Sequence, residues 1–291
     1  MERKAAKAIE LALLSAIRLI LMRSLTFKFS PLLVGWLVWL IALSFLLIKV
    51  IIQDPKRLKV GVKTLLVLFP IGFLGSSYNL LLIFGLKFSL ASHAAILLRL
   101  DIPITAILGY ISLQERIYFL DILAIILMIW GSLKVMEVSL AGLSSISMGD
   151  LLFIAAGLSI SINAILIKVL LKDLHRDTIA FYNLFYTVLL YTLYLPFLGE
   201  WSDLPILLEA KGDWLQLIGL GAITSVIYIV YYSSLEQLRA WIVRTLLLSV
   251  PIFTMILAYI FLKESLNLSQ IIGMGAVIAG GTTIVYNSRS K

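Results

Sequence analysis

The chain has 291 residues, of which 61% are hydrophobic and 14% are charged. Soluble globular proteins average about 45–50% apolar and 25% charged residues, so this composition excludes a soluble domain and indicates an integral membrane protein. The chain has no cysteine and two histidines, which excludes disulfides and thiolate metal sites and leaves too few histidines for a histidine-based metal site.

Apolar runs of about 20 residues, the length that crosses a bilayer as a helix, recur along the whole chain. The predicted spans are roughly 9–29, 31–52, 64–86, 90–113, 117–136, 149–171, 178–198, 214–235, 240–262 and 268–286. Charged residues interrupt only the first of them heavily, at Glu10, Arg18 and Arg23. A Ser- and Gly-containing connection at 139–148 separates a first half, 1–138, from a second half, 149–291. We therefore expect an all-α integral membrane fold of ten transmembrane helices, five in each half.

The net charge of +8 comes largely from Lys and Arg residues near the ends of these spans. When the N-terminus is placed in the cytoplasm, most of them fall on the cytoplasmic side, among them Lys56, Arg57, Lys172 and Arg239. This is the bias that the positive-inside rule describes. It predicts a multi-pass protein of the plasma membrane with both termini cytoplasmic, and it argues against a nucleic-acid partner.

Two stretches of the chain are similar to one another: Leu90–Met136 and Ala240–Tyr286. Each contains two apolar spans, a proline inside the first span (Pro103 or Pro251) and a glutamate at the polar corner between the spans (Glu115 or Glu264). We expect each glutamate to cap the N-terminus of the helix that follows it, where the helix dipole favours a carboxylate. Because each half has an odd number of spans, the two five-helix repeats are expected to be inverted across the membrane, an arrangement typical of secondary transporters.

Several short motifs accompany this duplication: Gly149–Leu152 with Lys168, Ser249–Thr254, Phe261–Glu264 and Gln270–Gly273. Together with the five-plus-five spans, they resemble the drug/metabolite transporter superfamily, EamA type, over nearly the whole chain. The resemblance implies two inverted five-helix repeats. It also implies a central substrate cavity that spans one, three, four, six, eight and nine help to line.

Charged side chains inside apolar spans are the strongest site candidates, because each is costly to place in a membrane. We expect Arg18, Arg99 and Arg244 to line the cavity and bind an anionic group. Asp101 is the candidate for proton coupling; it points about 200° away from Arg99 on a helix, so the two do not pair with each other. The alternative is that Arg99 and Asp101 pair with other helices and that Arg244 reaches the membrane surface.

Polar and aromatic side chains inside the spans supply the other candidates for substrate binding: Tyr78, Asn79, Asn163 and Tyr228. Aromatic rings give apolar contact to an organic substrate, while hydroxyl and amide groups orient it. The alternative is that they only join packed helices by hydrogen bonds.

No phosphate-binding loop and no HExxH motif is present, so we expect no enzyme activity, no cofactor and no metal site. The chain is predicted to be a secondary active transporter, an exporter or exchanger of a small organic metabolite that works by alternating access. The arginines favour a carboxylate-bearing substrate such as an amino acid, and a sugar-phosphate or nucleotide-sugar antiporter is the second choice. A membrane-embedded lipid-processing enzyme and a non-transporting partner subunit are alternatives from other classes, and a homodimer is left open.

Overall fold

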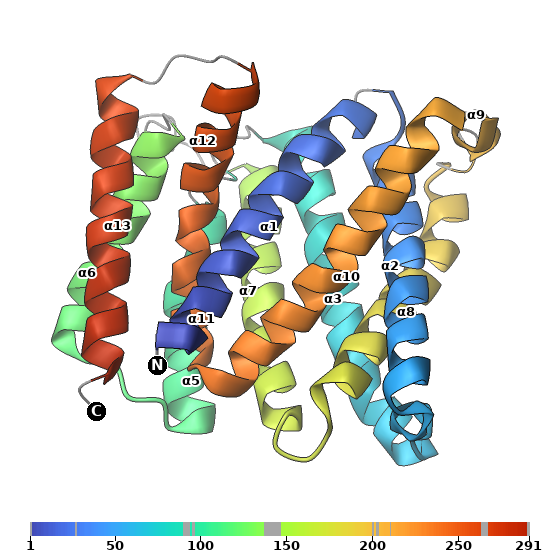
Figure 1. Ribbon diagram of the computed structural model, residues 1–291, viewed down its shortest axis with the longest axis horizontal. Helices are drawn as coiled ribbons and strands as arrows, with labels where there is room; N and C mark the ends of the chain where they lie inside the picture. The colour runs from blue at the N-terminus through green and yellow to red at the C-terminus, as the bar shows by residue number, and fades with distance from the viewer. Residues whose placement is uncertain are drawn as a thin grey trace.

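The computed structural model describes residues 2–26, 28–89, 94, 97–136, 147–199, 201, 204–209, 211–262 and 267–289, which form helices and turns without a strand among them. Figure 1 shows that the long helices lie side by side in one bundle, and most of them run from one end of it to the other. The longer helices are α1 (Glu2–Thr26), α2 (Pro31–Gln53), α3 (Val62–Phe88), α5 (Asp101–Leu113), α6 (Phe119–Val135), α7 (Met148–Leu170), α8 (Arg176–Phe197), α10 (Trp214–Gln237), α12 (Val250–Leu262) and α13 (Leu268–Arg289). The short ones are η1 (Pro55–Leu58), η2 (Leu98–Leu100), α9 (Leu204–Glu209), η5 (Lys211–Asp213), α11 (Ala240–Leu246) and η6 (Leu247–Ser249).

Seven stretches in the described part of the chain are long and apolar enough to cross a membrane: Pro31–Gln53, Val62–Gly85, Met148–Leu170, Arg176–Phe197, Trp214–Gln237, Ala240–Leu257 and Leu268–Asn287. The other predicted spans do not meet these criteria for separate reasons. Helix α1 carries Glu10, Arg18 and Arg23, α6 has only 17 residues, and the span at 90–113 is described only in part. Seven such helices make the chain a multi-pass membrane protein.

The fourth and ninth predicted spans are both interrupted by a turn of 3₁₀-helix. Turn η2 precedes α5, which carries Pro103, and η6 separates α11 from α12, which carries Pro251. A proline has no N–H to donate to the carbonyl four residues earlier, and its ring crowds the preceding turn, so the helix narrows or breaks there. Both copies of the duplicated stretch therefore have an interrupted α-helix at equivalent places.

Helix packing follows the same duplication. Helices that occupy equal places in the two halves pack against each other, as α2 with α8, α5 with α11, and α6 with α13. Contacts between helices that occupy different places in the two halves also occur in matching pairs. Helix α3 packs against α7 as α10 packs against α1, and α3 packs against α8 as α10 packs against α2. Likewise, α5 packs against α7 as α12 packs against α1. The halves are therefore interleaved, and exchanging them leaves the pattern of these main helix pairs unchanged.

Small residues allow the closest of these contacts. A Cβ atom at Gly131 of α6 would lie 2.6 Å from the carbonyl oxygen of Gly273 on α13, and the reverse distance is also 2.6 Å. Glycines permit this approach because they place no side chain between the two backbones. In the same way, Gly85 of α3 faces Gly149 of α7.

Both termini lie at one end of the bundle, which we call the terminal end (Figure 1). Near this end, Lys7 of α1 donates a 2.9 Å hydrogen bond to Ser233 near the end of α10. Asn287 near the end of α13 donates a 2.7 Å bond to Asp121 in the first turn of α6. The terminal end thus collects the starts of α1 and α6 with the ends of α10 and α13.

Candidate functional site

Charged and phenolic side chains from both halves meet inside the bundle. We call them the central cluster: Arg18 of α1, Tyr78 of α3, Arg99 of η2, Asp101 of α5, Tyr228 and Tyr231 of α10, and Arg244 of α11. Arg99, Asp101 and Arg244 lie beside the two helix breaks, and their neighbours come from long unbroken helices. The proline-induced breaks therefore place charged groups away from the ends of the spans.

Asp101 and Arg244 form an ion pair across the two halves, in which Nη2 of Arg244 donates to Oδ2 of Asp101. Their side chains are 7% and 13% exposed, respectively. Asp101 therefore pairs with another helix, and its partner Arg244 is largely buried within the bundle. Oδ1 of Asp101 and Nε of Arg244 are buried without a hydrogen-bond partner.

The other two arginines of the central cluster have no carboxylate partner among the described residues. Nε of Arg99 is buried without a hydrogen bond. Tyr78 interacts electrostatically with all four charged groups of the cluster, and Arg18 interacts with both Tyr78 and Tyr228. The central cluster thus contains three guanidinium groups and one carboxylate, which is paired with Arg244. Such an excess of buried positive charge is costly unless an anion or water compensates it.

Tyr231 belongs to the cluster although the sequence candidates did not include it. Its hydroxyl group interacts electrostatically with Arg244, and this buried hydroxyl has no well-formed hydrogen bond. A spacing of three residues from Tyr228 puts both on neighbouring positions of one helix face, which is the signal that could have identified it. Tyr232 instead lies fully buried, and its hydroxyl accepts a 2.5 Å hydrogen bond from the amide of Asn183 on α8.

The two predicted amide residues lie outside this set of electrostatic contacts. Asn163 is 2% exposed and donates to the carbonyl oxygen of Ile71 at 2.7 Å, which joins α7 to α3. Asn79 donates to the carbonyl oxygen of Gly75, one turn earlier in its own helix, at 3.0 Å. Both amides therefore donate to backbone carbonyl groups of α3, the helix that carries Tyr78.

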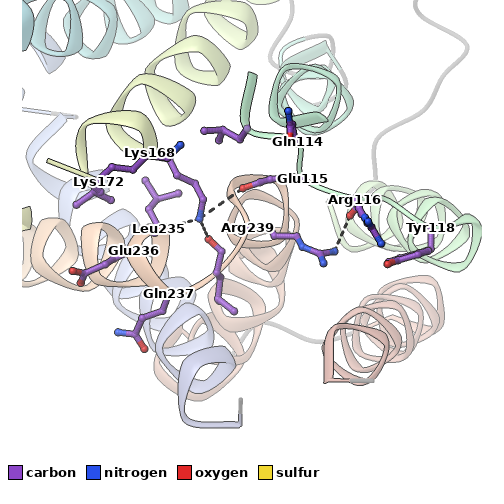
Figure 2. Close-up of a pocket in the computed structure, with 13 residues that line it drawn as sticks. Gln114, Glu115, Arg116, Tyr118, Lys168, Lys172, Leu235, Glu236, Gln237 and Arg239 are labelled. Carbon is purple, nitrogen blue, oxygen red and sulfur yellow. Dashed lines mark hydrogen bonds and ion pairs between the residues drawn. The ribbon is translucent and has the colours of Figure 1, made fainter. Parts of the chain in front are cut away.

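A pocket of about 950 Å³ opens elsewhere, between the end of α5, the end of α7 and the connection from α10 to α11. Figure 2 shows its lining, which contains four cationic residues and two carboxylates: Arg116, Lys168, Lys172, Arg239, Glu115 and Glu236. Arg239 donates to the carbonyl oxygen of Arg116 at 2.7 Å, which ties the α5–α6 corner to the start of α11.

Glu115 corrects one sequence expectation. Both of its carboxylate oxygens accept from the N–H of Ala240, at 3.0 and 3.1 Å, so it caps α11 of the other half rather than the next helix. Helix α6 is capped by its own Asp121, which accepts from the N–H of Tyr118 at 2.9 Å. The corresponding Glu264 lies outside the described residues.

Among the residues that the structure describes, no group of three His, Asp or Glu side chains is arranged to hold a metal ion. The chemistry available at the central cluster is therefore charge pairing, hydrogen bonding and aromatic contact. Those interactions suit the reversible binding of a small polar solute.

Comparisons with known proteins find one family and two relatives named as transporters. The family model described as the EamA-like transporter family matches residues 6–136 and 147–286. An uncharacterized transporter of Archaeoglobus fulgidus is 28% identical over 188 residues, covering 64% of this chain and 62% of that protein. The uncharacterized transporter YetK of Bacillus subtilis is 24% identical over 211 residues, covering 70% of this chain and 62% of that protein.

The matched region therefore spans less than two thirds of either relative. A solved crystal structure is similar to this chain with a TM-score of 0.80 at 15% sequence identity. The similarity covers 99% of this chain and 97% of the other, so the two share a fold.

Proposed function

Because the chain belongs to the EamA-like transporter family, we propose that it is a secondary active transporter that moves a small organic metabolite by alternating access. In this proposal ten helices cross the membrane as two inverted repeats, 1–138 and 149–291, joined by 139–148. The exchangeable pattern of helix pairs and the paired helix breaks support this arrangement. Inverted repeats allow a site at their interface to face either side of the membrane in turn.

The proposed substrate carries an anionic group, a carboxylate as in an amino acid. The observation that carries this choice is the central cluster, which contains three arginines and one aspartate, and in which only Arg244 is paired with that aspartate. An arriving anion would supply the missing negative charge and accept hydrogen bonds from guanidinium groups, which bind carboxylates and phosphates with two parallel bonds. A sugar phosphate or nucleotide-sugar would satisfy the same charges and forms the second arm of the test.

Different members of the cluster take different roles. Arg18 and Arg99 bind the anion, since Arg244 is already engaged by Asp101. The rings of Tyr78 and Tyr228 provide apolar contact, and their hydroxyls orient the solute. Asn79 and Asn163 hold the backbone of α3 in place beside the site.

Asp101 is the proposed coupling residue. Asp101 is paired with Arg244, so a proton that Asp101 accepts during transport would release Arg244 and add a further cation to the site. Proton uptake and anion binding would then support each other. This gives the charge exchange that a proton-coupled or exchange transporter needs.

The proposed location is the plasma membrane, with both termini in the cytoplasm. Support comes from the terminal end of the bundle, where Lys168, Lys172, Arg176 and Arg239 gather around the ends of α7 and α10. Cytoplasmic loops of membrane proteins carry such an excess of Lys and Arg.

The test is uptake by reconstituted vesicles from a panel of amino acids, organic acids and sugar phosphates, with the solute recovered chemically unchanged. Arg99→Lys keeps the charge but loses the planar fork, and Arg99→Gln loses both. Each lost charge-assisted hydrogen bond is worth about 1.5–3 kcal/mol, so we expect affinity to fall roughly tenfold for the lysine variant and up to about a hundredfold for the glutamine variant. Arg176→Gln, which removes an exposed ion pair with Glu236, is the matched control.

Affinity that survives in the double variant Arg18→Gln/Arg99→Gln would contradict the anion site and leave the transporter assignment in place. Uptake of neutral solutes only, or chemical conversion of the solute, would contradict the substrate class or the transport function itself.

A further inference from the structure

Glu115 is a buried acidic residue that the proposed substrate site does not use. It is 7% exposed and lies just beyond the end of α5, at the pocket of the terminal end. Burying a carboxylate costs free energy unless cationic groups or N–H donors lie around it. The groups that contact its carboxylate all come from the second half of the chain.

The backbone conformation at the end of α5 directs the side chain of Glu115 back along the helix. Gln114 adopts the left-handed conformation with φ of 54°, and the N–H groups of both Gln114 and Glu115 point back to the carbonyl oxygen of Gly109. A Cβ atom at Gly109 would lie 2.9 Å from Oε2 of Glu115. The glycine therefore leaves the space in which the carboxylate folds back along α5.

The carboxylate joins two elements of the other half. It accepts from the N–H of Ala240 at the start of α11, and its Oε1 lies 3.7 Å from Nζ of Lys168 on α7. Lys168 in turn donates to the carbonyl oxygens of Leu235, at 2.8 Å, and Leu238, in the connection that leads to α11. Figure 2 shows Lys168 at the centre of these contacts, between Glu115 and the end of α10.

These contacts lie on the same two helices as the central ion pair. Helix α5 begins with Asp101 and is followed by Glu115, while α11 begins with Ala240 and carries Arg244 one turn later. The two helices are thus joined at two levels, by Asp101 with Arg244 and by Glu115 with Ala240. Separating them at the terminal end requires the Glu115 contacts to break, and any rotation of α11 that follows moves Arg244.

We propose that Glu115 and Lys168 form a latch that holds the terminal end of the transporter closed, between the pocket and the central cluster, and that opens once in each transport cycle. The latch rests on the proposed alternating-access function. It is a positioning device, because neither side chain belongs to the central cluster. Its contacts are charge-assisted and largely shielded from solvent, so they hold the helices together more firmly than an exposed ion pair would.

The test reads the gate through a single reporter cysteine, which the absence of native cysteines makes simple. Ala164 is fully buried and lies one turn inward from Lys168 on the same face of α7. In an Ala164→Cys background, a membrane-impermeant maleimide is applied from the terminal side, and its rate of labelling measures opening. We expect Glu115→Ala and Lys168→Met each to raise this rate about tenfold or more, the change that follows from losing a charge-assisted hydrogen bond.

Two further variants keep the result interpretable. Glu115→Gln retains an oxygen for the N–H of Ala240 but loses the charge opposite Lys168, so it should raise the rate less than Glu115→Ala. Gly109→Ala crowds the carboxylate from the other side and should raise the rate without changing either latch residue. Glu236→Gln is the matched control, since it breaks an exposed ion pair at the same end and should leave the rate unchanged.

Unchanged labelling in both Glu115→Ala and Lys168→Met would overturn the latch. An equal rise in labelling from the opposite side of the membrane would also overturn it, because that result indicates general loosening of the bundle. If Glu115→Ala does not fold, the graded response of Glu115→Gln and Gly109→Ala decides. Labelling requires no substrate, so a failure of the substrate proposal is seen in uptake and a failure of the latch is seen in labelling.

Discussion

At the scale of single residues, the central ion pair lies where two helices are interrupted. Asp101 and Arg244 flank the two breaks, and their ion pair reduces the cost of holding each charge away from water. The pair is incompletely satisfied, since one oxygen of Asp101 and Nε of Arg244 have no partner. An incompletely satisfied buried pair is suited to exchange partners when a ligand or proton arrives.

Removing one member of this pair should destabilise the protein strongly. Asp101→Asn leaves Arg244 buried and unpaired, which we expect to cost about 3–5 kcal/mol of folding stability. Adding Arg244→Gln should recover part of that loss because the uncompensated charge is then gone. Thermal unfolding of the purified protein in detergent measures both. Asp213→Asn, which breaks the exposed pair with Lys28, is the control and should cost below about 1 kcal/mol. Additive losses in the double variant would mean that the two residues do not interact.

At the scale of elements, the N-termini of the helices are capped by side chains of several kinds. Helix α7 begins with a capping box, in which Ser147 and Asp150 each accept from the backbone N–H of the other, at 3.2 and 2.8 Å. Helix α8 instead begins with His175, whose Nδ1 accepts from the N–H of Asp177 at 3.1 Å. Because only a neutral imidazole nitrogen can accept a hydrogen bond, the second cap is sensitive to pH.

Acidification should therefore weaken the start of α8. Burial lowers the pKa of His175 below its ordinary value, against the opposing effect of Asp177, so the folded protein takes up this proton less readily than the unfolded chain. The stability contributed by the cap is complete above about pH 6.5 and is lost as pH falls below it. Melting temperature measured from pH 7.5 to 5 should fall more steeply in the parent than in His175→Asn, which keeps a neutral acceptor at the cap. Equal slopes in the two proteins would rule out this role.

At the scale of the whole molecule, the interleaved halves determine how the bundle moves. The helix pairs α6 with α13 and α2 with α8 each contain one member from each half, so the halves share their interfaces throughout. The glycine contact between Gly131 and Gly273 makes one of these interfaces very close. Relative motion of the halves is therefore expected where the helices are broken, at η2 and η6, rather than along the closely packed pairs.

The proposed topology places Lys59, beside η1, and Glu209, at the end of α9, on opposite sides of the membrane. With single cysteines in this cysteine-free chain, an impermeant maleimide added to intact cells should label Glu209→Cys and should label Lys59→Cys only after permeabilisation. A buried position such as Leu33→Cys should resist labelling in both conditions. Labelling of both exposed positions from the same side would exclude the inverted-repeat topology.

The sequence by itself determined the class of fold and the family. A bilayer requires about 20 apolar residues per span, so the spans can be counted along the chain. Pro103 and Pro251 occur at matching places of the two similar stretches and accompany the helix breaks, whereas Pro70 lies inside the unbroken helix α3, so a proline alone does not locate a break. The sequence also identified Arg18, Arg99, Asp101 and Arg244, because charges inside apolar runs are conspicuous in any arrangement of the helices.

Only the tertiary structure decided which of these side chains meet. The partner of Asp101 lies 143 residues away, and the helix that Glu115 caps begins 125 residues away. Asn163 bonds to the backbone of α3, and Tyr231 joins the cluster, whereas its neighbour Tyr232 bonds to Asn183 of α8. The physical reason is rotation: the face that a helix turns toward its neighbours depends on how all the helices pack, and apolar spans surrounded by lipid carry little local pattern that would specify it.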